Sequence, residues 1–427
     1  MSKDQQRTSA GEALSNLFQG AMSGELSRRQ ILGRAAALGV SGSMLTALLR
    51  VAPGAGAQAT PTVSGDPVVI GCPYNLTGGY ASIDNPARDG SLLAAMELNA
   101  GDGILGRPVE LKVYDGKSET TTISSVVQRL IEEDEVPVLV GLTDTSFMLA
   151  GGQLAQDAGV PFLDVGGTAP IITSIGDYIF MLPFGDNVQA AAAAEFANEK
   201  GWKTCALLLD EAMDYTKFLA AYFDARFTAD DIGGEIIAES TYSMGDTDFS
   251  GQLTDFANLD PQPDFLFISS NPGEIGTIIK QARDLGLEQP ILGGDGYDTT
   301  LLVELAGDTA HDIYFTTHQG IFGDSPEGAA FLEAYEAEYG ATPEVAFSAL
   351  GYDGIKLMAD AITRAGSLEG EAIRDALAAT EGFKGATGEI TYEEGERIPS
   401  KSVALVEIVD QVPTLIEIVV PETIPPA

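Results

Sequence analysis

The stretches "VPVLVG", residues 136–141, and "VPFLDVGG", residues 160–167, are short apolar runs that end in glycine. Runs of this length, rich in valine, are typical of strands that are buried on both faces of a sheet. Two similar runs, "VVIGC" and "VELKVYD", come before them, and the segments between the runs have helical spacing. Strands that alternate with helices predict stacked βαβ units and a parallel sheet.

The same alternation restarts after residue 184. Further β-rich runs read "TCALLLD", "GEIIAEST", "DFLFISS", "QPILGGD" and "IYFTT", again with helices between them. We therefore predict an α/β fold of two Rossmann-like lobes, each with a parallel central sheet, joined by a hinge. We place lobe 1 at residues 67–184 and 315–390, and lobe 2 at residues 185–314 and 391–427.

The loops after the third and fourth strands of each half predict a binding cleft. They read "GLTDTS" and "GGTAP" in the first half, and "SSNPGE" and "GGDGY" in the second. Ligands of open parallel sheets bind outside the carboxyl ends of the strands, so two facing lobes would place Asp295 on a cleft wall. Taken alone, Asp-Gly is a common turn pair. In this position, the glycines beside Asp295 are interpreted as room for a ligand to approach the backbone.

The beginning of the chain has the pattern of an export signal. Arg28 and Arg29 precede a mildly apolar stretch of about 15 residues, shorter than the roughly 20 that span a membrane. A small-residue tract then gives an A-x-A cleavage site before Gln58. The pattern resembles a twin-arginine signal peptide over residues 1–57, followed by a linker over residues 58–66. We expect a protein that works outside the cytoplasmic membrane of a prokaryote; an uncleaved anchor is the alternative.

Composition excludes several classes of partner. With 63 acidic and 23 basic residues, the formal net charge is -40, which repels nucleic acids and anionic membrane surfaces. Cys72 and Cys205 lie in apolar runs and are predicted to be buried thiols. His311 and His318 lack the spacing of a zinc site, so we interpret them as surface or cleft histidines and expect no metal or cofactor. Because no nucleophile-elbow or P-loop motif is present, we expect no enzymatic activity.

The order of the motifs resembles one known family. The segments that carry the resemblance are "IGCPYNLTGGYAS", "AAMELNAGDGILGRPVELKVYD", "LIEEDEVPVLVG", "GVPFLDVGGTAP", "GDTDFSGQLTDF" and "IIKQARDLGL". Together they are similar to the leucine/isoleucine/valine-binding proteins, the type I periplasmic solute-binding components of ABC transporters. The resemblance covers nearly the whole mature chain. It implies the type I periplasmic binding protein fold, a small amino-acid ligand, a membrane permease as partner and a monomeric protein.

In that family the first lobe holds the α-carboxylate of the ligand with a hydroxyl group and backbone N–H groups. The matching positions are Thr145 with Ser146, and Gly167 with Thr168. Donors of this kind at a helix N-terminus form an anion site without a basic residue. Taken without the resemblance, helix-capping roles for Thr145 and Thr168 are equally well supported.

In the second lobe the family supplies an aromatic residue and an acid that receives the ligand's ammonium. The resemblance assigns these roles to Tyr215 and Asp295, although Asp replaces the more common Glu. Asn271 stands at a loop position that is often aromatic, and Ile83 matches a position that covers the ligand's side chain. For Ile83, a hydrophobic lid and a core-facing side chain both remain open.

We therefore expect a small zwitterion as ligand, an aliphatic amino acid first. The alternatives are a sensor that signals to a receptor or kinase, or a binder of urea, a short amide or an aromatic acid.

Overall fold

The computed structural model describes residues 63–323 and 325–427. The predicted leader, residues 1–57, lies outside the described residues, as do residues 58–62 of the predicted linker. Within the part of the chain that is described, no helix combines the length and the apolar character needed to span a membrane.

The first sheet has five strands, all parallel, in the order β2-β1-β3-β4-β5. The central strands form because their apolar runs are covered by helices on both faces, and every residue of β3 is buried. The strands are β1 (Val68–Tyr74), β2 (Val109–Asp115), β3 (Val138–Gly141), β4 (Phe162–Asp164) and β5 (Ile179–Met181).

The second sheet has seven strands in the order β14-β13-β10-β9-β8-β6-β7. Strands β6 to β10 are parallel, whereas β13 runs antiparallel to β10 and β14 antiparallel to β13. They are β6 (Thr204–Asp210), β7 (Glu235–Tyr242), β8 (Phe265–Ser269), β9 (Ile291–Gly293), β10 (Ile313–Thr317), β13 (Val403–Val409) and β14 (Val412–Val419). The predicted α/β fold with parallel central sheets is confirmed.

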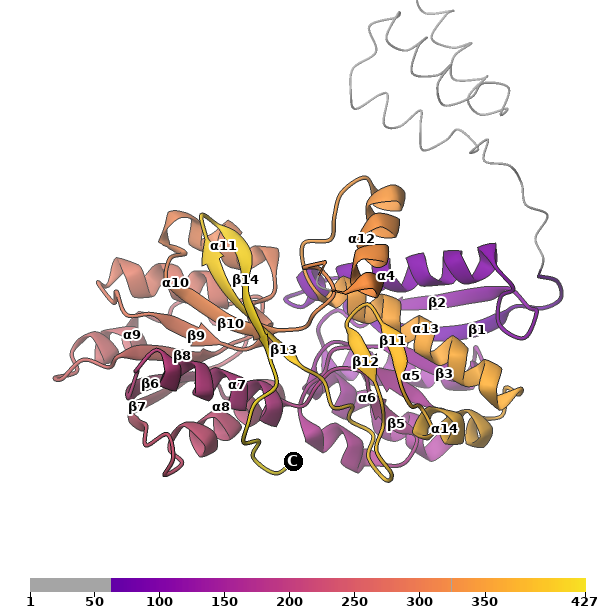
Figure 1. Ribbon diagram of the computed structural model, residues 1–427, viewed down its shortest axis with the longest axis horizontal. Coiled ribbons are helices and arrows are strands. Elements are labelled where there is room, and N and C mark those ends of the chain that lie inside the picture. The colour runs from indigo at the N-terminus through magenta and orange to yellow at the C-terminus, as the bar shows by residue number, and fades with distance from the viewer. Residues whose placement is uncertain (1–62, 324) are drawn as a thin grey trace, which may run out of the picture. The chain divides into compact units, whose positions relative to one another are not determined.

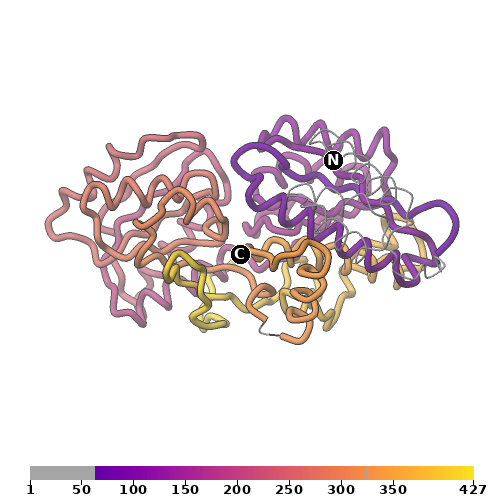
Figure 2. Tube along the Cα trace, turned by 90° about the horizontal axis from the view of Figure 1, so that it is seen from above, coloured from indigo at the N-terminus to yellow at the C-terminus, as the bar shows by residue number. Residues whose placement is uncertain are grey.

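Helices from two distant parts of the chain cover the first sheet, and together they form the first lobe (Figure 1). In Figure 2 the orange segment with α13 runs beside the indigo segment with α4. The helices are α4 (Ala81–Ala100), α5 (Thr120–Glu132), α6 (Thr145–Ala158), α12 (Pro326–Tyr339), α13 (Phe347–Ala365) and α14 (Gly370–Ala378). The hairpin of β11 (Phe383–Gly385) and β12 (Gly388–Ile390) packs against α13.

Glycines allow α4 and α13 to approach closely. A Cβ on Gly90 would lie 1.8 Å from the carbonyl oxygen of Ser348, and a Cβ on Gly351 would lie 1.8 Å from that of Ala87. The hydroxyl of Ser91 also donates to the carbonyl of Gly351 at 3.0 Å. The late helix α13 is therefore fixed to the beginning of the chain by backbone contact.

The second lobe consists of the second sheet and the helices between its strands. These helices are α7 (Asp186–Glu199), α8 (Asp214–Phe227), α9 (Ser250–Ala257), α10 (Ile275–Asp284) and α11 (Thr300–Ala306). One apolar core lies on each face of this sheet, and a separate core fills the first lobe. Cys72 and Cys205 are buried, free thiols in these lobes, as predicted.

The chain passes between the lobes three times: after β5, after β10 and after β12. Strand β10 continues to Thr317 within the second sheet, so residues 315–317 of the predicted lobe 1 segment lie in the second sheet. The other predicted domain limits remain a prediction.

Candidate ligand site between the lobes

A small cavity lies where the carboxyl ends of strands from both sheets meet. Its volume is about 10 Å³, close to the space for one water molecule. The first lobe contributes the loops after β1, β3 and β4 and the start of α13, and the second lobe contributes the segments after β6, β8 and β9. The lining residues are Tyr80, Ile83, Thr143, Asp144, Gly166, Thr168, Tyr215, Pro272, Asp295, Gly296 and Phe347.

Four of the eight predicted site residues line this cavity: Ile83, Thr168, Tyr215 and Asp295. The other four, Thr145, Ser146, Gly167 and Asn271, are not among its lining residues and form hydrogen bonds with other parts of the protein. Their predicted ligand roles remain predictions. Ile83 is buried and also belongs to the apolar core of the first lobe, so its two interpretations are compatible.

Asp144 caps the helix whose N-terminus the resemblance assigns to a ligand carboxylate. Its Oδ1 accepts the backbone N–H of Ser146 at 2.7 Å and that of Phe147 at 3.4 Å. Aspartate is a preferred N-cap because its carboxylate satisfies the free amides of the first turn. Burial raises the pKa of Asp144 to about 7, against the lowering effect of these hydrogen bonds. The amides therefore already have an anionic partner within the protein.

The predicted donors after β4 are arranged in a similar way. Oδ1 of Asp164, the last residue of β4, accepts the N–H of Gly167 at 3.0 Å and that of Gly166 at 3.4 Å. Oγ1 of Thr145 accepts the N–H of Ala169 at 3.2 Å, which ties the two loops together. These donors and acceptors shape the first-lobe wall of the cavity.

Asp295 begins a short 3-10 turn directly after β9 and is 2% exposed. Its Oδ1 accepts from Nε2 of Gln189 at 2.9 Å, and its Oδ2 lies 3.1 Å from Nε2 of His318. Burial lowers the pKa of His318, although Asp295 opposes this shift, so the ring is a neutral donor at neutral pH. His318 thus proves to be a cleft histidine, one of the two interpretations of its sequence position.

A second acid, Asp186, lies close to Asp295 at the start of α7. Burial raises the pKa of Asp186 well above its usual range, and the charge of Asp295 adds to this effect. Two buried carboxyl groups that face each other cannot both ionise without a large electrostatic penalty. The raised pKa of Asp186 therefore favours its protonated form.

The glycines beside Asp295 make room for protein atoms. A Cβ on Gly294 would lie 2.7 Å from the hydroxyl of Tyr215, and one on Gly296 would lie 2.3 Å from the carbonyl of Ser270. The hydroxyl of Tyr215 accepts the N–H of Gly296 at 3.0 Å. This space is filled by Tyr215 and a neighbouring loop, although Gly296 also lines the cavity, so the interpretation of the glycines as clearance for a ligand stays a prediction.

Among the hydrogen bonds that join the lobes beside the cavity are three that involve Tyr80, Ser146 and Ser82 of the first lobe. Oδ1 of Asn271 lies 2.5 Å from the hydroxyl of Tyr80, while its Nδ2 donates to Oδ2 of Asp210 at 2.5 Å. The hydroxyl of Ser146 accepts the N–H of Asp214 at 2.8 Å. The third bond, from Thr299 to Ser82, is also 2.8 Å long. Both Asn271 and Ser146 thus form hydrogen bonds between the lobes.

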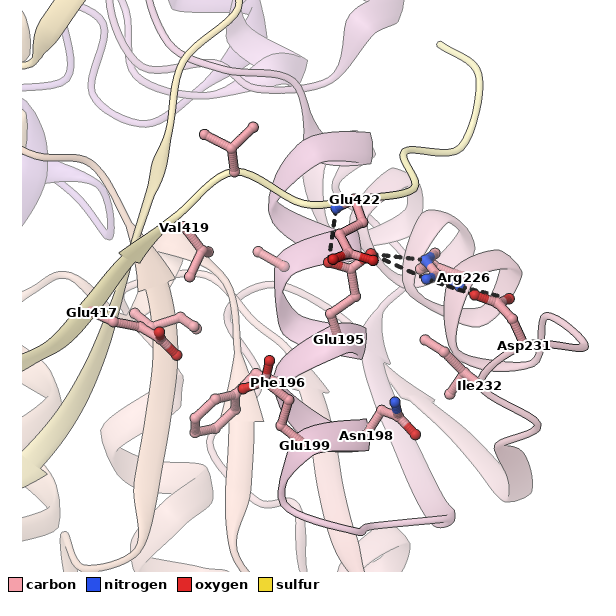
Figure 3. Close-up of a pocket in the computed structure, with 13 residues that line it drawn as sticks. Glu195, Phe196, Asn198, Glu199, Arg226, Asp231, Ile232, Glu417, Val419 and Glu422 are labelled. Atoms are coloured by element: carbon pink, nitrogen blue, oxygen red, sulfur yellow. Dashed lines mark hydrogen bonds and ion pairs between the residues drawn. The ribbon is translucent and has the colours of Figure 1, made fainter.

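A larger cavity of about 330 Å³ lies elsewhere in the second lobe. Figure 3 shows its lining, in which Glu195 and Asp231 both point toward Arg226. The carboxylate of Glu195 also accepts the backbone N–H of Glu422 at 3.0 Å, which holds the C-terminal segment against α7. These groups are satisfied within the protein, and none of the predicted site residues lines this cavity.

Comparison with known proteins agrees with this arrangement. A profile of the periplasmic binding protein family matches residues 67–412. The leucine-, isoleucine-, valine-, threonine-, and alanine-binding protein of Pseudomonas aeruginosa is 25% identical over 337 residues, which are 79% of this chain and 88% of that protein.

Two solved structures show the same fold. The branched-chain amino acid substrate-binding protein LivJ of Streptococcus pneumoniae, in complex with isoleucine, is 31% identical, with a TM-score of 0.78 over 83% of this chain and all of that chain. A solute-binding protein of Rhodopseudomonas palustris, in complex with 3,4-dihydroxybenzoic acid, is 25% identical, with a TM-score of 0.75 over 84% of this chain and 99% of that one. The chain therefore belongs to the periplasmic binding protein family and has its two-lobed type I fold, as the leucine/isoleucine/valine-binding motifs in its sequence predicted.

Proposed function

We propose that this protein is the solute-binding component of an ABC transporter and binds a small, amine-bearing solute between its lobes. The observation that carries the proposal is Asp295, a buried carboxylate on a cavity wall that also contains Tyr215 and Phe347. A carboxylate in a site of low dielectric attracts an ammonium group far more strongly than it does in water. The names of the relatives make aliphatic amino acids the first ligands to test.

Binding requires that the lobes separate and close again. A cavity of about 10 Å³ is too small for an amino acid, so the solute enters an open form. The bonds from Tyr80 to Asn271 and from Asp214 to Ser146 then form as the lobes come together. Hinge closure of this kind desolvates the ligand and strengthens its polar contacts.

The remaining parts of the proposal concern export and partners. Residues 1–57 direct the protein through the twin-arginine route, and the mature chain works as a monomer that delivers its solute to a membrane permease. The paired arginines Arg28 and Arg29 support the route. Replacement of both by lysine should retain the precursor in the cytoplasm, as cell fractionation would show; unchanged export would contradict the assignment.

The ligand is tested by a thermal-shift screen of the mature protein, followed by calorimetry. Amino acids, amino-acid amides, simple amines and aromatic acids form the panel. A ligand at 100 times its Kd stabilises the protein by about 2.7 kcal/mol, which is easily detected. We expect hits among the compounds with an amino group; a panel in which only aromatic acids bind would refute the proposal.

A further inference from the structure

The first-lobe wall of the cavity contains a carboxylate at the place where the resemblance predicts an anion site. Asp144 is 2% exposed and lines the cavity. Its Oδ1 occupies the amides of Ser146 and Phe147, and its Oδ2 contacts the hydroxyl of Tyr80 at 2.9 Å. A ligand carboxylate that approached these two amides at the N-terminus of α6 would meet the carboxyl group of Asp144, which already accepts both of them.

Several neighbouring donors on this wall also have acceptors within the protein. Asp164 accepts the amides of Gly166 and Gly167, and the hydroxyl of Thr143 donates to Oδ2 of Asp84 at 2.6 Å. A hydroxyl group that donates its proton in this way offers a ligand its lone pairs alone. At Thr143 and Asp144, the wall therefore presents hydrogen-bond acceptors.

The composition of the cavity lining acts in the same direction. Asp144 and Asp295 line the cavity from opposite lobes, and no lysine or arginine is among its lining residues. Asp84, Asp164 and Asp186 are buried behind the wall, and Oδ2 of Asp186 has no hydrogen-bond partner among the described residues. The lining also contains three aromatic rings, those of Tyr80, Tyr215 and Phe347, and such rings favour cations over anions.

We infer that the ligand is a small organic cation without a carboxylate, with an ammonium group at Asp295 and a second N–H donor at Asp144. This inference rests on the proposed function and specifies the class of solute. A zwitterionic amino acid would place like charges together at Asp144, where the low dielectric makes repulsion strong. A carboxamide, an amine or a plain alkyl group in place of the carboxylate removes this repulsion, and the first two also supply donors.

The test compares probes that differ at one group. Calorimetry of the mature protein at pH 8 would use L-leucine, L-leucinamide, 3-methylbutylamine and 1,4-diaminobutane. Leucinamide keeps the side chain and ammonium of leucine and replaces its carboxylate by an N–H donor. We expect at least one carboxylate-free probe to bind tenfold or more tightly than leucine. Tighter binding of leucine would overturn the inference and leave the proposed function intact, whereas binding by none of the four would overturn both.

The variant Asp144→Ser separates this explanation from a general preference for cations. Serine is also a good N-cap, so the helix keeps its start, but the negative charge is lost. We expect the preference for leucinamide over leucine to fall at least tenfold in this variant. The Tm of the variant checks its folding, and Asp144→Asn, which keeps the shape without the charge, should reduce the preference in the same direction. An unchanged preference in both folded variants would overturn the inference.

Discussion

The hydroxyl of Tyr80 in the first lobe lies 2.5 Å from Oδ1 of Asn271 in the second, and this contact is the centre of a chain of four side chains. Asp144 contacts Tyr80 at one end, and Asp210 contacts Asn271 at the other. The three hydrogen bonds in this chain would need three donated protons. The phenol of Tyr80 and one N–H of the Asn271 amide supply two. The phenol therefore shares its one proton between Asp144 and Asn271, while the amide of Asn271 donates to Asp210.

Removal of the phenol should weaken closure. In Tyr80→Phe the cross-lobe bond is lost, at a cost of about 1 kcal/mol to the closed form and roughly fivefold in ligand affinity. Small-angle X-ray scattering should show a larger radius of gyration without ligand. Tyr74→Phe is the matched control because Tyr74 bonds to Ser91 within the first lobe, at 2.8 Å. Equal effects of the two changes on affinity would contradict a role of Tyr80 in closure.

Protonated carboxyl groups should make the protein more stable in mild acid. Burial raises the pKa of both Asp84 and Asp144 to about 7. Because both folded pKa values lie above the unfolded value near 3.8, the stabilisation is complete below that value. It is lost as the pH rises toward 7. Between pH 5 and pH 7, the free energy of unfolding should fall by about 2 kcal/mol for each group.

Urea denaturation of the mature protein at several pH values measures this slope. The groups around Asp144 and Asp84 include the acids Asp164, Asp186, Asp214, Glu274 and Asp295, the phenol of Tyr80, and the neutral His318 near Asp295. The lowered pKa of His318 acts in the opposite direction below pH 6.5. The difference between wild type and Asp144→Asn isolates one group: the fall in the free energy of unfolding between pH 5 and pH 7 should be about 2 kcal/mol smaller in the variant. A variant with the wild-type slope would contradict the assignment.

Loss of the charge at Asp295 should reduce affinity for any amine ligand. In Asp295→Asn we expect at least a tenfold weaker Kd, with the fold retained because Gln189 can still donate to the remaining oxygen. Calorimetry would use the probe that the wild-type protein binds most tightly. Asp312→Asn, an exposed change in the same lobe, removes an equal charge and should leave the Kd unchanged. Equal affinity of Asp295→Asn and wild type would refute the ammonium assignment.

The contact between α4 and α13 gives a prediction about stability. Gly351→Ala would force a methyl group to within 1.8 Å of the Ala87 carbonyl, and such overpacking costs about 1 to 3 kcal/mol or more. Gly251→Ala is the control, because a Cβ at this position in α9 would meet nothing within 4 Å. The control should be neutral or more stable by up to about 1 kcal/mol. Similar Tm values for the two variants would show that the helices can move apart at little cost.

The sequence was sufficient to predict the two sheets, because their central strands have no polar face. Strands β3 and β8 are buried at every position, so their apolar runs are distinct from the surrounding helices. The rule that ligands bind outside the carboxyl ends of parallel strands predicted Asp295 and Thr168 at a cleft, since both follow central strands, and both line the cavity. Local pattern and the rule for strand ends were enough at these positions.

The rest of the site depends on contacts that local sequence does not encode. Asp144 has the pattern of any N-cap, and its presence in the cavity became clear once Tyr80 was placed beside it. Asn271 bonds to Tyr80 and to Asp210, a residue 61 positions earlier, and does not line the cavity. Phe347 enters the site from the start of α13, long after the strands that it faces. In the sequence, the segment "TGGYAS" was the one signal that could have indicated Tyr80.

The position of α13 also has a consequence for the order in which the protein folds. Ser91 and its partner Gly351 are 260 positions apart, and the whole parallel part of the second sheet is synthesised between them. A nascent chain therefore carries α4 with an uncovered apolar face until translation is almost complete. The first lobe, although it begins first, is finished last. Premature termination before α13 would leave both lobes incomplete, because β13 and β14 of the second sheet follow α13 in the sequence.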